Sequence, residues 1–543
     1  MDKEDRQFTL LERFFSLATS LRPGEGKSIL ILTSQAFFTM LCYSLIRPAK
    51  EALILSEQGA EVRSYATGAQ TLILLFLIPI YSSWVRKNSG SSMIQKLNLF
   101  FAINLLMFYF ALVNGLQIGI AFYMWMAIFN VMVLAQFWAF TTDLYNVKSG
   151  QRLFVVIMLG ASLGGLVGSR IAVELFSVIE VQGLVLLAAI ILMFTLFLSN
   201  MAKHSIPDES KCHESVDDAQ PHPSLLGGFA VVARDAYLIM IAAFMVFLNW
   251  VSTNGDYIIG DYVVSWANEQ VALGVYESTV AATGAFYADY IFWVNLVSLA
   301  LQGLVVSRLF RWLGVGGTVL ILPIVMIIAY GLILIIPIFS LIRLAKITEL
   351  GVNYSIANTT RQALFLPTSR EAKYEGKMAI ETFFWRFGDL FSMATVFIGI
   401  NLFSFTISEF VLTNFILSII MMLIALKVSQ HHHQKVTTNV MNEAPLAMES
   451  VDNLIIKPGV PFAYIIPKET FYDPDPGDAL RYKVRTVDGR PLPKWLRFIS
   501  LECCFAGKAP DNLDYNFEID IILIATDFDG LSAKTNFKIH REI

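Results

Sequence analysis

Charged residues inside long apolar stretches are the residues of this sequence whose types and spacing are suited to chemistry. The first such stretch ends with Arg47, Lys50 and Glu51, which share one face of a helix beside Pro48. Charges are costly in a hydrocarbon layer and usually mark a pathway or a charge pair. We therefore expect these side chains to face a central anion site, with snorkelling at a helix end as the alternative.

A hydrophilic stripe follows the apolar stretch 339–361. Arg343, Lys346, Glu349, Asn353 and Arg361 recur there at helical spacing on an otherwise apolar helix. Such a face cannot point at lipid. It must line a cavity or pair with other helices.

Further charges lie in the segment 370–389 and at the end of the stretch 119–142. A salt-bridge network between helices that opens and closes is the competing interpretation for any single pair. The predicted substrate-binding residues are Arg47, Lys50, Lys346, Arg361 and Lys377. The predicted charge-pair or gating residues are Glu51, Asp143, Glu349, Glu381, Arg386 and Asp389.

Small residues in the stretch 152–176 predict a close helix contact. Gly160, Gly164 and Gly168 recur at four-residue steps and so share one helix face. We interpret them as packing residues, because this spacing alone is weak evidence for a ligand site.

Composition excludes several classes of protein. Of the 543 residues, 55% are hydrophobic and 15% are charged, which rules out a soluble globular protein. The formal net charge of −4 leaves no basic surplus for nucleic acid. The sequence shows no phosphate loop, nucleophile elbow, metal signature or disulfide framework. We expect a membrane protein that is not an enzyme, holds no cofactor and draws its energy from gradients or exchange.

Twelve apolar stretches are long enough to cross a bilayer, since a crossing needs about 20 apolar residues. Lys and Arg gather in the connections after even-numbered stretches, which predicts an inner-membrane protein with both ends of its membrane domain in the cytoplasm. The longest polar interruption falls between the sixth and seventh stretches. This pattern predicts an all-α polytopic membrane protein of the major facilitator type with two six-helix halves. The stretches are 28–48, 66–85, 94–114, 119–142, 152–176, 181–201, 236–257, 286–306, 316–337, 339–361, 378–402 and 406–427.

The composition changes abruptly after Lys427 to short alternating segments separated by Pro, Gly and Asp. Period-two alternation with frequent turn residues predicts a small antiparallel β-sandwich. The predicted domains are a cytoplasmic segment 1–27, halves 28–201 and 236–427 joined by a cytoplasmic connection 202–235, a linker 428–454 and the sandwich 455–543.

Residues 28–427 resemble the ATP/ADP carrier family of plastids and intracellular bacteria, twelve-span nucleotide transporters of the major facilitator superfamily. Residues 47–53 look like the family's R-P-x-K-[DE]-x-L element, and Phe137-Trp138 with Arg152 looks like its F-W…R element. Residues 358–386 look like its late T-[KR]-[EQ]…P…K-x-x-K-A-x-[IL]-[DE]…R segment. The resemblance implies ATP/ADP exchange or nucleotide uptake. It also implies that Lys50 and Lys377 contact phosphates, with Glu51, Asp143 and Glu381 as acidic partners.

Two departures from the family pattern indicate a divergent member. Arg361-Gln362 stands where the exchangers usually have Lys-Glu. Asp389 follows Gly388 where the exchangers have a lysine, and losing that cation reduces the attraction for a polyphosphate.

The tail resembles a dystroglycan-type cadherin-like module, with Asp473, Trp495, Gly507, Pro510 and Asp527 among its marker positions. Such modules are commonly extracellular, whereas the charge pattern puts this one in the cytosol. Either one crossing is miscounted, or the module works inside the cell as a regulatory domain or one that binds a protein partner. Its acidic residues have two interpretations. Their carboxylates bind calcium, or the residues simply form turns. The calcium candidates are Asp473, Asp475, Asp527 and Asp529.

Together these features predict a membrane transporter that moves a nucleotide or related organic anion by alternating access. Two alternatives stay open at this point. One is a membrane-anchored interaction protein that displays the cadherin-like domain. The other is a major facilitator carrier for a non-nucleotide solute.

Overall fold

A computed structural model shows two compact units, Met1–His433 and Gln434–Ile543, which we call the helical unit and the β unit. Each is described by itself. The structure describes residues 25–542 except 88–90, 146, 204, 206–224, 370, 441–443, 449, 475–479, 489–490, 501–502 and 528–529.

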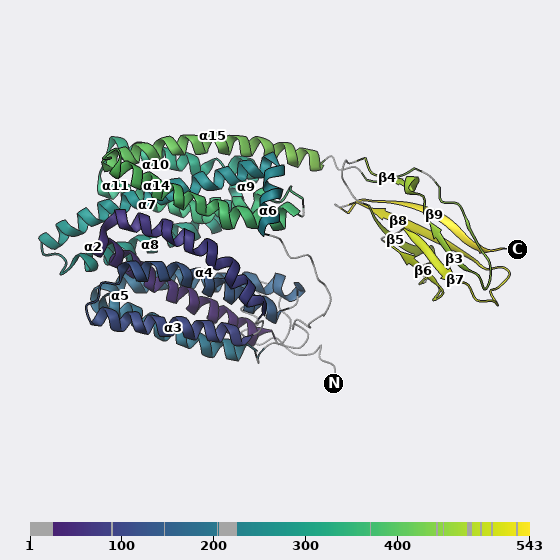
Figure 1. The fold of residues 1–543 in the computed structure, drawn as a ribbon, viewed down its shortest axis with the longest axis horizontal. Helices are drawn as coiled ribbons and strands as arrows, with labels where there is room; N and C mark the ends of the chain where they lie inside the picture. The colour runs from purple at the N-terminus through teal and green to yellow at the C-terminus, as the bar shows by residue number, and fades with distance from the viewer. Residues whose placement is uncertain are drawn as a thin grey trace. The chain divides into compact units, whose positions relative to one another are not determined.

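The helical unit is a bundle of antiparallel helices (Figure 1). The first half of the chain forms α2 (Gly26–Lys87), α3 (Ser91–Val113), α4 (Gly119–Leu144) and α5 (Val147–Lys203). The second half begins with α6 (Leu225–Arg234), α7 (Ala236–Ala272), α8 (Thr279–Leu304), α9 (Val306–Thr318) and α10 (Ile321–Ile335). It continues with α11 (Phe339–Val352), η3 (Asn353–Ala357), α12 (Asn358–Leu364), η4 (Ala372–Gly376), α13 (Lys377–Ala379), η5 (Ile380–Phe384), α14 (Trp385–Asn401) and α15 (Ile407–Val440).

Eight helices in the described part of the chain are long and apolar enough to cross a membrane, or nine if α9 and α10, bent by 80°, form one broken span. Two of the eight run for 52 and 47 residues. At about 1.5 Å per residue these are roughly twice the ~30 Å hydrocarbon thickness. Non-helical backbone at Gly59 (φ 80°) and Glu180 (φ 55°) divides each into two crossings. Dividing these two helices turns the eight candidate helices into ten crossings. The bent pair of α9 and α10 and the charged segment 339–364 add one crossing each, so the described residues supply the predicted twelve crossings.

Side-chain contacts confirm that α2 turns back on itself at Gly59. Arg63 Nε lies 2.6 Å from Glu51 Oε2, although the two residues are 12 apart in sequence. In a straight helix that separation spans about 18 Å, so the contact exists only because the chain reverses between them.

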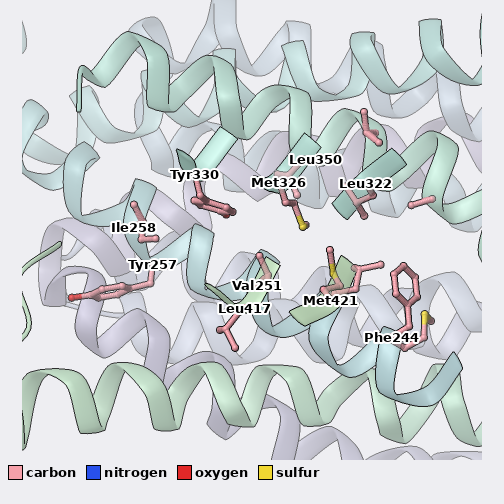
Figure 2. Packing of buried hydrophobic residues seen from close by; sticks show 14 of the residues in the cluster. Phe244, Val251, Tyr257, Ile258, Leu322, Met326, Tyr330, Leu350, Leu417 and Met421 are labelled. Atoms are coloured by element: carbon pink, nitrogen blue, oxygen red, sulfur yellow. The ribbon is translucent and has the colours of Figure 1, made fainter. Parts of the chain in front are cut away.

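Three apolar clusters lie in the described part of the helical unit. Two are built mainly from α2, α3, α4 and α5, around residues such as Phe101 and Ile157. The third is built mainly from the second half, where Val251, Tyr330 and Leu417 belong to one buried cluster (Figure 2), and α2 and α4 add a few side chains to it. In Figure 1 the purple-to-blue helices and most of the green helices accordingly form separate groups. The predicted six-plus-six layout is confirmed.

Small residues bring α5 against the first arm of α2, as predicted. A Cβ atom built on Gly160, Gly164 or Gly168 would lie 2.7 Å or less from an atom of Thr33, Phe37 or Leu41 respectively. No side chain fits in that space. The three glycines therefore allow the two backbones to touch.

Gly164→Ala is expected to destabilise the helical unit by about 1–3 kcal/mol, because overpacking forces helices apart. Its Cβ would lie 2.1 Å from the Phe37 carbonyl oxygen, a backbone atom that cannot move alone. Thermal unfolding of the purified chain in detergent measures the loss. Gly303→Ala is the matched control, since a Cβ there meets no heavy atom within 4 Å. Equal unfolding temperatures for the two variants would contradict this packing.

The two ends of the bundle follow from the chain order. We call the end at which α5 stops and α6 begins the connection end, and the opposite end, where Gly59 and Glu180 lie, the distal end. The segment 339–364 begins at the distal end and reaches the connection end at Leu364. The next crossing, Ala372–Asn401, runs back to the distal end.

The β unit is a sandwich with sheets ordered β2-β9-β8-β5 and β3-β7-β6 and a small β1-β4 pair. Phe505, Ile521 and Phe537 lie in its core. The predicted sandwich is confirmed, but purely antiparallel pairing is wrong, because β2 pairs with β9 in parallel. The strands are β1 (Leu446–Ala447), β2 (Leu454–Ile456), β3 (Pro461–Ile465), β4 (Phe471–Tyr472), β5 (Arg481–Thr486), β6 (Leu496–Ile499), β7 (Cys504–Lys508), β8 (Glu518–Thr526) and β9 (Ser532–Arg541).

Candidate functional site

Six buried or half-buried charged residues form a continuous chain of ion pairs in the helical unit. Three are cations and three are carboxylates, so their charges cancel. We call this set the central charge network: Lys50, Glu51, Arg63, Asp256, Lys346 and Glu349.

The part of the network on α2 is centred on Glu51. Lys50 Nζ lies 3.1 Å from Glu51 Oε1, and Arg63 reaches both carboxylate oxygens, at 2.6 and 3.3 Å. The ring of Tyr123 on α4 lies 4.5 Å from Lys50 Nζ, which adds a cation–π contact. Both cations therefore have partners inside the first half.

The part of the network in the second half is centred on Glu349. Lys346 Nζ lies 3.0 Å from both oxygens of Glu349, and the Tyr330 hydroxyl donates to Oε2 at 2.8 Å. Gly255 on α7 makes room for these groups. A Cβ atom there would lie 2.1 Å from the Tyr330 oxygen and 2.7 Å from Lys346 Nζ.

Asp256 on α7 joins the two parts. Its Oδ1 lies 3.3 Å from Lys346 Nζ and its Oδ2 lies 3.8 Å from Arg63. The Arg63–Asp256 contact crosses from the first half to the second. A buried carboxylate is tolerated only when it is paired, so moving the halves apart at this level has an electrostatic cost.

Two members of this network, Arg63 and Asp256, are not among the site residues predicted from the sequence. The structure places Arg63 in α2 with 6% of its surface exposed, and Asp256 within α7. The only signal in the sequence was a single charged residue beside or inside an apolar stretch. The partners could not be read from it, because Glu51 lies across the reversal of α2 from Arg63 and Lys346 lies on another helix from Asp256.

Arg47 has a different environment from Lys50. Its guanidinium donates to the Tyr354 hydroxyl at 3.2 Å and, among the described residues, forms no ion pair. Tyr354 lies in η3, in the second half, and is 39% exposed although it contacts the first half. The two halves therefore do not close around this tyrosine.

A polar pocket of about 240 Å³ lies near the connection end. Arg361 donates to Asn358 at 3.1 Å and lies 4.6 Å from the centre of the Trp385 ring. Gln362 bridges Lys377 and Glu381, accepting from the first and donating to the second at 3.0 Å. Neither Arg361 nor Lys377 is ion-paired with a described carboxylate. The pocket is lined by Met245, Asn358, Arg361, Gln362, Glu381 and Trp385.

Asp389 on α14 lies apart from these groups, and its donors among the described residues are all neutral. Asn249 and Thr253 of α7 donate to Oδ1 at 2.8 and 2.9 Å, and Thr71 of α2 donates to Oδ2 at 3.0 Å. Arg386, one turn earlier, interacts with it electrostatically without an ion-pair contact in the described structure. The structure thus divides the described site residues into the central charge network, Arg47 beside Tyr354, the group at the connection-end pocket, and Asp389 with Arg386.

Three of the remaining predicted residues cannot be compared with the structure, because it does not describe their side chains. They are Asp143, Asp475 and Asp529. Asp527 Oδ1 accepts from the backbone amides of Gly530 and Leu531 at 2.7 and 2.8 Å, the pattern of an acidic turn residue. The described residues contain no group of three or more His, Cys, Asp or Glu side chains arranged to hold a metal ion.

The tail matches one known family. Residues 444–542 match the family model described as "Putative Ig domain". This is a coarser assignment than the dystroglycan-type module predicted from the sequence. No curated protein matches the chain.

Solved transporter structures are similar to this chain in fold. A bacterial homologue of the human lysosomal transporter Spinster, inward-facing and unoccupied, is 13% identical, with a TM-score of 0.53 over 77% of this chain and 99% of that chain. The nucleoside transporter NupG is 11% identical, with a TM-score of 0.52 over 75% and 99%. The POT family transporter PepTSo is 11% identical, with a TM-score of 0.51 over 77% and 99%. The helical unit of this chain therefore has the major facilitator fold, and its tail is an Ig-like β-sandwich.

Proposed function

We propose that this protein is a membrane transporter that moves a nucleotide or a related organic anion by alternating access. The observation that carries the proposal is the contrast between its paired and unpaired cations. Lys50, Arg63 and Lys346 are neutralised within the central charge network. Arg47, Arg361 and Lys377, in contrast, make no ion-pair contact in the described structure, although Glu381 interacts electrostatically with Arg361 and Glu51 with Arg47.

Pairwise contacts link the three cations to one another. Tyr354 contacts Arg47 and interacts electrostatically with Arg361, two turns further along the same crossing. Lys377 is bonded to Gln362, next to Arg361. Guanidinium and ammonium groups replace the hydration shell of a phosphate or carboxylate by charge-assisted hydrogen bonds. A route from the connection-end pocket toward Arg47 therefore suits a multiply charged anion.

The central charge network fits the role of a gate on the distal side of this route. Arg63 and Asp256 join the halves at 3.8 Å, and Leu55 lies 3.4 Å from the Cβ position of Gly260 nearby. Breaking these contacts opens the distal side. After opening, Lys50 and Arg63 share Glu51 in the first half, and Glu349 and Asp256 share Lys346 in the second half. Each charge keeps a partner, but the two parts carry net charges of +1 and −1, so the opening has an electrostatic cost.

The Lys and Arg pattern supports an orientation in an inner membrane with the connection end in the cytoplasm. In that orientation the pocket around Arg361 takes up its anion from, or releases it to, the cytoplasm. The β unit then also lies in the cytoplasm.

A thermal-shift screen of the purified full chain tests the function. ATP, ADP and other organic anions are compared with adenosine, which has the same base but no phosphate. A ligand at about 100 times its dissociation constant stabilises the fold by about 2.7 kcal/mol, so the substrate raises the unfolding temperature and adenosine does not. Uptake of labelled ATP into proteoliposomes loaded with ADP measures transport directly. The proposal is abandoned if no anion shifts the unfolding temperature and none is transported.

A further inference from the structure

Asp389 is a predicted gating residue whose hydrogen bonds in the described structure all come from neutral donors. Its neighbours on α7 and α2 are amide and hydroxyl groups, and Arg386 on its own helix makes no ion-pair contact with it. Asp256, which lies on α7 just after the donor Thr253, forms ion pairs with Lys346 and Arg63 instead. Asp389 therefore interacts with Arg386 only at a distance and makes no ion pair in the described structure. Intramembrane carboxylates of this kind are among the groups that form proton relays.

The helices around Asp389 are packed closely enough to fix these contacts. A Cβ on Gly388 would lie 2.7 Å from the backbone of α7, and a Cβ on Gly68 would lie 2.3 Å from the Met393 sulfur. Asp389 therefore lies where α14 meets both α7 and the second arm of α2. Its position is set by backbone packing rather than by a flexible side chain.

The two oxygens of Asp389 belong to different interfaces. Oδ1 is bound by Asn249 and Thr253, which are in the same half as Asp389. Oδ2 is bound by Thr71 alone, and Thr71 is in the other half. Moving one half against the other removes the only described donor of Oδ2 while leaving Oδ1 satisfied.

We propose that Asp389 is a proton-binding site that couples transport to a proton gradient. A proton from the aqueous side forms an O–H bond at Oδ2, which neutralises the carboxylate and allows the halves to part at Thr71. When Thr71 returns, the proton leaves to water on the other side and Oδ2 again accepts the threonine hydroxyl. The hydroxyls of Thr71 and Thr253 both donate and accept, so they satisfy the charged and the neutral forms alike.

The donor geometry favours a proton over a sodium ion. Asn249 Nδ2 donates at 2.8 Å both to Asp389 and to the Trp385 carbonyl oxygen, which has no proton to give. The amide therefore presents its NH₂ group, not its oxygen, to the carboxylate. Metal cations such as Na⁺ require oxygen ligands on all sides, which this arrangement does not provide.

The test uses the full chain in proteoliposomes with labelled ATP as probe, and to that extent rests on the proposed function. The membrane potential is clamped, and uptake is driven by a proton gradient, by a sodium gradient or by ATP counterflow. With one proton per solute, a gradient of about one pH unit supports about tenfold accumulation by the wild type. Asp389→Asn mimics the protonated form, so it loses gradient-driven accumulation and keeps counterflow. Glu269→Gln, an exposed acid on α7, responds to the gradient like the wild type.

Three results overturn the proton site: accumulation driven by sodium, gradient-driven accumulation by Asp389→Asn, and loss of counterflow together with accumulation in that variant. Infrared spectroscopy of the purified protein gives a readout that needs no substrate. The carbonyl band of a protonated carboxylic acid should appear on acidification of the wild type and be reduced in Asp389→Asn. If wild-type liposomes transport no ATP, the proposed substrate fails, while this band still decides whether Asp389 binds a proton.

Discussion

Replacing Lys346 by methionine is expected to destabilise the helical unit by about 3–5 kcal/mol, the usual effect of removing one partner of a buried ion pair. Lys346 is 2% exposed and is the shared partner of Glu349 and Asp256, at 3.0 and 3.3 Å. Without it, Glu349 keeps only the Tyr330 hydroxyl, and its charge is buried without a cation. Unfolding of the purified chain in detergent, followed by temperature, measures the loss.

Arg343 provides the matched control, because it lies one turn away on α11. Arg343 and its partner Asp289 are 36% and 32% exposed, so Arg343→Met is expected to cost at most about 1 kcal/mol. The double variant Lys346→Met/Glu349→Gln recovers part of the stability, because it removes the stranded carboxylate. Similar stability for Lys346→Met and Arg343→Met would show that the buried ion pairs of Lys346 do not stabilise the helical unit.

Arg361→Gln is expected to weaken anion binding by about 10- to 100-fold without unfolding the protein. Arg361 makes no ion pair in the described structure, so its removal strands no carboxylate. It removes the guanidinium that faces the 240 Å³ pocket, and with it the charge-assisted hydrogen bonds to the substrate. The concentration dependence of the ATP-induced thermal shift measures the affinity, and uptake into proteoliposomes measures the consequence.

Arg308→Gln is the control for this variant. Arg308 is an exposed arginine near the same end of the bundle, where it donates to the Leu304 carbonyl outside the pocket. Its replacement should leave both affinity and uptake near the wild-type values. If Arg361→Gln binds ATP as tightly as Arg308→Gln, the connection-end pocket is not the anion site.

The sequence alone was sufficient for the architecture. Each segment carries side chains that suit its surroundings, so the sequence pattern predicts where the segment lies. The pattern consists of apolar stretches of bilayer length, a long polar interruption between 201 and 236, and alternating residues after 454. The glycine spacing of 160, 164 and 168 likewise predicted a backbone contact that the structure shows. These features depend on neighbouring or regularly spaced residues, so they can be predicted from the sequence alone.

The tertiary structure decided which charges pair. Glu51 and Glu349 were expected to balance cations, but Arg63 and Asp256 complete the network only because α2 reverses at Gly59 and α7 of the second half contacts α2. The same folding leaves Asp389 with neutral donors from two other helices. Spacing along one helix fixes which side chains share a face. Whether a buried charge meets an opposite charge, a hydroxyl or open space depends on the helix packed against that face, and no single stretch of sequence encodes that neighbour.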